Sequence, residues 1–117
     1  MGTITEYLPI GLFAIAALGG VTLAVMKFMG KQLPIPLAIL HGIFAAAGIV
    51  TLALNLVQTR TNTAMNVSML LFILAAAGGF MLFSQDLMKK RQPGLLIGAH
   101  GLTAVVSFVL LLASVLR

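Results

Sequence analysis

Residues 32–59 read QLPIPLAILHGIFAAAGIVTLALNLVQT, a run with no charged side chain and a single histidine, His41. A helix needs roughly 20 apolar residues to cross the hydrocarbon core of a bilayer, which is about 30 Å thick. Three further charge-free runs are long enough, at 7–26, 61–85 and 92–116. Because unpaired backbone groups are too costly in lipid, each run should form a helix. The sequence therefore predicts an all-α membrane protein, a bundle of four transmembrane helices in contact with the lipid bilayer.

The composition supports this fold class. Of the 117 residues, 61% are hydrophobic and 8% are charged, which is too few charges for the polar surface of a soluble domain. No basic residue precedes the first run, and that run is too long for the apolar part of a signal peptide, so we expect it to remain as a helix. The whole chain, 1–117, is predicted to form a single transmembrane domain.

Cysteine and charge narrow the function classes. The chain has no cysteine, which excludes disulfides, cysteine-ligated iron–sulfur clusters and covalently attached haem. The net charge of +5 does not indicate nucleic-acid binding, because the basic residues cluster at the ends of the predicted helices, where they set orientation.

The helices are expected near 8–29, 35–58, 63–87 and 94–116, with Pro9, Pro34 and Pro93 at helix starts, where a missing N–H costs little. Short connections make successive helices antiparallel neighbours. Sliding the sequence by 59 residues aligns 12–58 with 71–117 without a gap, and sixteen of the 47 pairs are identical. Composition alone would give about a tenth. We therefore predict two tandem helical-hairpin repeats, related by a pseudo-twofold axis along the membrane normal.

The basic residues predict the orientation. Five of them flank the connections within the two hairpins, whereas only Arg60 and Arg117 lie on the other side; the five are Lys27, Lys31, Lys89, Lys90 and Arg91. By the positive-inside rule, both hairpin loops are cytoplasmic and both termini are outside. A bacterial inner membrane is the expected location.

His41 and His100 are the only histidines, and they occupy equivalent positions in the two repeats. Each lies seven residues beyond a proline, so roughly 10 Å along its helix and inside the hydrocarbon. An ionisable residue at that depth is a functional candidate, and a neutral imidazole is a good metal ligand. We therefore interpret both histidines as candidate metal ligands.

One b-type haem per chain, held without covalent bonds, fits this pair, because haem iron can take two axial imidazoles. The small residues around the histidines either serve close helix packing or leave room for the flat macrocycle. Basic residues at the helix ends are candidates to pair with the propionates. The candidate cofactor-binding residues are thus His41, His100, Gly19, Gly20, Gly78, Gly79, Ala45, Ala104, Lys31 and Lys90.

In architecture, the chain resembles bis-histidine haem b membrane bundles. That resemblance implies an electron-transfer subunit of a larger redox complex, with a quinone as a candidate partner and no catalytic residues of its own. The main alternative is a structural accessory subunit whose histidines only form hydrogen bonds. Two weaker alternatives are a pigment-binding protein with one magnesium per histidine and a small transporter. Small multidrug exporters have this size, but they depend on an acidic residue within the first helix, whereas Glu6 is expected to lie just before that helix.

Overall fold

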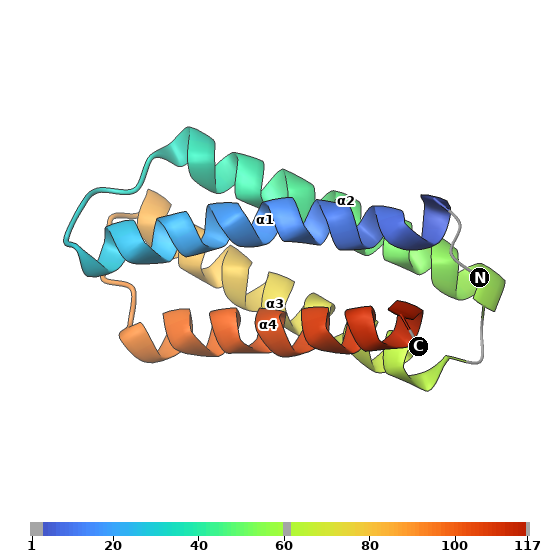
Figure 1. Ribbon diagram of the computed structural model, residues 1–117. Coiled ribbons are helices and arrows are strands. Elements are labelled where there is room, and N and C mark those ends of the chain that lie inside the picture. The colour runs from blue at the N-terminus through green and yellow to red at the C-terminus, as the bar shows by residue number, and fades with distance from the viewer. Residues whose placement is uncertain (1–3, 60–61, 117) are drawn as a thin grey trace.

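The computed structural model describes residues 4–59 and 62–116, and these form four antiparallel α-helices (Figure 1). The helices are α1 (Ile4–Phe28), α2 (Ile35–Thr59), α3 (Thr63–Leu87) and α4 (Gly94–Leu116). Each is long and apolar enough to cross a membrane. The predicted all-helical bundle of four membrane-spanning segments is therefore confirmed. Of the residues used to predict orientation, Arg60 and Arg117 lie outside the described part of the chain.

The observed helix ends agree with the expected ones except at the start of α1. This helix begins at Ile4, so Pro9 lies inside it rather than at its start and Glu6 lies in its first turn rather than before it; both expectations were wrong. Pro9 is the sixth residue of the helix, so its missing N–H removes one backbone hydrogen bond near the N-terminus. Its ring is also fully buried in the bundle. Pro34 and Pro93 each directly precede a helix, as expected, and their carbonyls accept hydrogen bonds from the first turn.

The two hairpin loops have the same geometry. In each loop the last turn closes with a backbone hydrogen bond spanning five residues, from Lys31 to Met26 (2.9 Å) and from Lys90 to Gln85 (2.8 Å). The preceding residue has a positive φ in both, 76° at Gly30 and 55° at Lys89. This is a Schellman motif, which ends a helix by satisfying its last carbonyls. Glycine adopts that conformation without cost, whereas lysine does not.

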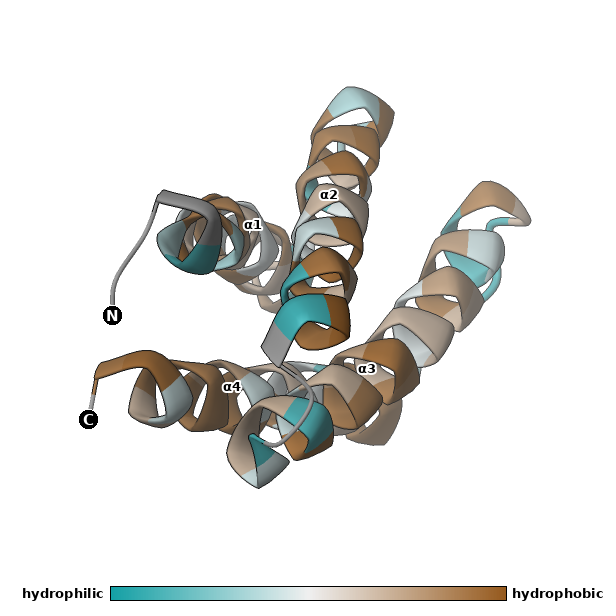
Figure 2. Cartoon of the chain, turned by 90° about the vertical axis from the view of Figure 1, so that its right-hand side faces the viewer, coloured by the Kyte–Doolittle hydropathy of each residue, from teal (hydrophilic) through white to brown (hydrophobic). Residues whose placement is uncertain are grey.

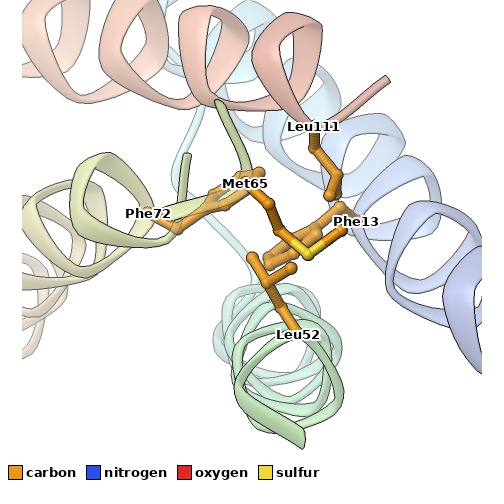
Figure 3. Packing of buried hydrophobic residues seen from close by; sticks show 5 residues of the cluster. All are labelled: Phe13, Leu52, Met65, Phe72 and Leu111. Atoms are coloured by element: carbon orange, nitrogen blue, oxygen red, sulfur yellow. The ribbon is translucent and has the colours of Figure 1, made fainter. Parts of the chain in front are cut away.

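The helices associate mainly within the hairpins α1–α2 and α3–α4, and the two hairpins meet along a small aromatic core (Figure 3). Phe13 of α1 and Phe72 of α3 stack face to face, with ring centroids 3.7 Å apart and planes 3° from parallel. Leu52 and Leu111 are fully buried beside them, together with Met65. Phe13 matches Phe72 in the repeat alignment, and Leu52 matches Leu111. The core is therefore built from equivalent positions of the two repeats.

The outward faces of the helices are apolar along most of their length (Figure 2). Large side chains such as Leu18 (72% exposed) and Leu95 (88% exposed) face away from the bundle. Such surface would be unfavourable in water but suits hydrocarbon, where the helices need no polar exterior. The fold therefore suits an integral membrane protein in contact with lipid.

Candidate functional site

His41 and His100 each make the same hydrogen bond inside their own hairpin. The Nδ1 atom of His41 lies 2.7 Å from the Ala16 carbonyl oxygen, and that of His100 lies 2.7 Å from the Ala75 carbonyl oxygen. A carbonyl only accepts, so each Nδ1 carries the proton and donates it. The lone pair of a neutral imidazole then sits on Nε2. Metal-binding histidines typically have this arrangement, with one ring nitrogen donating to a carbonyl and the other free for the metal.

The two imidazoles lie next to each other across the interface between the hairpins. Their ring centroids are 6.2 Å apart and their planes are nearly perpendicular, at 87°. The structure therefore brings together the two histidines that the sequence places 59 residues apart.

This separation can be compared with that of two imidazoles bound to one metal ion. Taking about 2 Å for each metal–nitrogen bond and about 1 Å from ring centre to nitrogen, rings on opposite sides of one metal have centres about 6 Å apart. The observed 6.2 Å matches that spacing. The distance between the rings is therefore compatible with a shared ion.

The paired glycines of α1 and α3 form the surface on which the histidine rings lie. A Cβ added to Gly20 would come within 2.9 Å of His41 Cε1, and one added to Gly79 within 3.0 Å of His100 Cε1. At Gly19 and Gly78 the nearest histidine atoms would be 3.5 and 3.7 Å away, an ordinary contact. In this structure the glycines thus make room for the imidazoles themselves. Whether they also contact a macrocycle stays a prediction.

The remaining candidate residues lie at increasing distances along the helices. Ala45 and Ala104 are half-buried one turn beyond the histidines on the same helix faces. Lys31 and Lys90 are exposed in the hairpin loops, ten residues before the histidines. The structure thus places the alanines beside the histidine pair and the lysines at the loop end of the bundle.

Two features of this site were missed by sequence reasoning: the carbonyl groups of Ala16 and Ala75, and the Phe13–Phe72 stack. All four residues are identities in the repeat alignment, and they line one face of α1 and α3 at helical spacing, followed by Gly20 and Gly79. That periodic set of identities was the available signal. From this set one could have placed the phenylalanines about one helical turn from the alanine carbonyls, on the side away from the hairpin loops.

Two histidines cannot enclose a metal ion by themselves. Among the described residues, no group of three or more histidine, cysteine, aspartate or glutamate side chains is placed to hold one. Any ion between His41 and His100 therefore needs other ligands. A planar macrocycle would supply four and leave two axial positions for the imidazoles.

No known protein guides this interpretation. The chain matches no protein-family model, no curated protein and no solved structure. The functional argument therefore rests on the geometry of the site alone.

Proposed function

We propose that this chain is a membrane electron-transfer subunit that holds one b-type haem between His41 and His100. The observation that carries the proposal is the matched pair of hydrogen bonds to Ala16 and Ala75. These bonds leave both Nε2 lone pairs available on rings whose centroids are 6.2 Å apart. A structural histidine gains from one such bond, but it does not require a second histidine at that distance.

Two axial imidazoles determine which haem chemistry the site supports. Held by both histidines, a haem would have no position open to oxygen or substrate and would supply transfer of single electrons. The chain's own residues would bind and orient the group: the carbonyls fix the ring tautomers, and the glycines let the rings lie against α1 and α3. The exposed Lys31 and Lys90 are the candidate partners of the propionates.

The proposal extends to orientation and partners. The hairpin loops, which carry most of the described basic residues, face the cytoplasm of a bacterial inner membrane, and the chain ends face the opposite side. Among the described residues no segment forms a soluble redox domain, so the subunit would work with partner subunits or with a lipid-soluble carrier.

The test is a visible spectrum of the intact protein, purified in mild detergent after expression with haem available. Oxidised and dithionite-reduced samples are compared between the wild type and the double variant His41→Ala/His100→Ala. The proposal predicts a sharp reduced-minus-oxidised band in the green that is absent from the double variant. A featureless spectrum from folded wild-type protein would overturn it and favour an accessory subunit. A far-red band would indicate a pigment instead.

A further inference from the structure

A groove between α1 and α2 opens on the outer surface of the first hairpin, and His41 contributes to its lining. Its volume is about 300 Å³. Leu18, Leu40 and Phe44 belong to its walls, and Leu18 and Leu40 are 72% and 51% exposed. Because these side chains face the lipid, the groove is open to molecules dissolved in the bilayer. It is thus a route by which such a molecule can approach one candidate haem ligand.

The lining of the groove limits what it can bind. It contains no charged residue, and its polar side chains are His41 and Thr22. The Thr22 hydroxyl donates to the Leu18 carbonyl at 2.8 Å, so its oxygen is left as an acceptor. A volume of 300 Å³ is at the lower end of small-molecule sites and too small for a helix. The groove therefore suits a small neutral molecule that is soluble in lipid and has a polar group at one end.

The second repeat has different residues at these positions. Leu18, Leu40 and Phe44 correspond to Ala77, Ala99 and Thr103, and Thr22 corresponds to Met81; His41 and His100, in contrast, are identical. Three of the large wall residues are thus specific to the first repeat, and the threonine hydroxyl comes from the first helix of that hairpin rather than, as Thr103 does, from the second. The histidines are thus identical in the two repeats while several residues around them differ, so the outer side of His41 offers a different surface from the outer side of His100.

We infer that this groove binds the headgroup of a membrane quinone or hydroquinone against the His41 ring. The inference rests on the proposed function, in which a lipid-soluble electron carrier is one of the two kinds of partner. Oxidation of a hydroquinone to the quinone releases two electrons and two protons; a single haem would take up the electrons one at a time, in two successive steps, and the protons would pass to water. The hydroxyl of Thr22 is placed to accept a hydrogen bond from the hydroquinone.

Photolabelling tests the binding site without relying on haem. The full chain in lipid nanodiscs is irradiated with a short-chain azido-benzoquinone, and labelled peptides are mapped with and without excess unlabelled short-chain quinone. We expect competed labelling on Leu18–Thr22 and on Leu37–Phe44. Thr22→Met, which introduces the side chain of the second repeat, should lower the labelling about tenfold, because it removes the hydroxyl and adds bulk to the groove. Leu18→Ala, which removes part of the groove wall, should also lower the labelling.

The matched control is Val21→Met, which introduces methionine at the residue directly before Thr22. Val21 is exposed but does not line the groove. This variant should label like the wild type. Uniform labelling of all lipid-facing helices, or labelling unaffected by competitor or by Thr22→Met, would overturn the inference. Labelling at the groove in a protein that holds no haem would support the binding site while contradicting the proposed function. Haem-loaded protein without labelling at the groove would contradict the inference alone.

Discussion

The two hairpins of this protein share the residues of the histidine site and of the aromatic stack, and they differ around the groove beside His41. Four features occur in both repeats. They are the histidines, the alanine carbonyls that accept their hydrogen bonds, the glycines under the rings and the stacked phenylalanines. On the outer side, the residues around each histidine differ in size and polarity, and so do the loop residues Gly30 and Lys89. The comparison indicates that the repeats kept the histidine pair and its immediate contacts while the residues of the groove diverged.

The largest effect is expected from breaking the contact that joins the hairpins. Phe13→Ala and Phe72→Ala each remove one ring of the same stack. Each should therefore lower the free energy of unfolding by a similar amount, about 3 kcal/mol. Unfolding in mixed detergent would measure them, together with the double variant. Because the partners are lost together, the double variant should cost clearly less than the sum. Strictly additive costs would show that the rings do not stabilise each other.

An intermediate effect is expected from crowding the histidine rings. Gly20→Ala and Gly79→Ala place a methyl group 2.9 and 3.0 Å from an imidazole carbon, so each ring must move, at a cost of about 1–3 kcal/mol for overpacking. On the proposed function, each variant should also lose haem to detergent faster than the wild type.

The controls for this crowding are Gly42→Ala and Gly101→Ala, the glycines next to the histidines. An added Cβ there meets no atom within 4 Å. These two variants should match the wild type in haem retention and should be as stable or up to about 1 kcal/mol more stable, because a helix favours alanine over glycine. If they behave like Gly20→Ala, the crowding explanation is wrong.

The smallest effect is expected in the loops, where the repeats differ at one left-handed position. Lys89→Gly should stabilise the protein by about 1 kcal/mol, because glycine adopts a positive φ without the penalty of a side chain. The reverse type of change, Gly30→Ala, should destabilise it by a similar amount. Lys90→Gly, which removes the same charge at a residue with negative φ, is the control and should give no gain. The free energy of unfolding is again the measured quantity.

The sequence predicted the four helices well because membrane spans are set by length and by charge-free runs, both of which can be read directly. It misplaced the start of α1, since a proline marks a helix start only by tendency and Pro9 is instead buried in the bundle. The candidate histidines could be found from their depth and repetition. Their partners could not, because a backbone carbonyl is present at every residue and only the packing of α1 on α2 selects Ala16.

The groove beside His41 was also beyond sequence reasoning. A quinone was considered as a partner, but no residue pattern located a site for it. The groove depends on how Leu18 of α1 and Leu40 of α2 stand on either side of the space near Thr22, and this arrangement exists only once two helices are packed. Aligning the repeats shows that these positions differ, but not that they enclose a space.

The central claim is that both histidines bind one iron, and the haem content of the single variants tests it most directly. Haem per chain is measured in the wild type, His41→Ala and His100→Ala after identical purification, with folding checked by the helix content of each sample. The account predicts a ratio near one in the wild type and a similar, nearly complete loss in both single variants, because each removes an axial ligand of the same iron. Retention of about half the haem in each variant would contradict the account, since it would mean that each histidine binds a separate group.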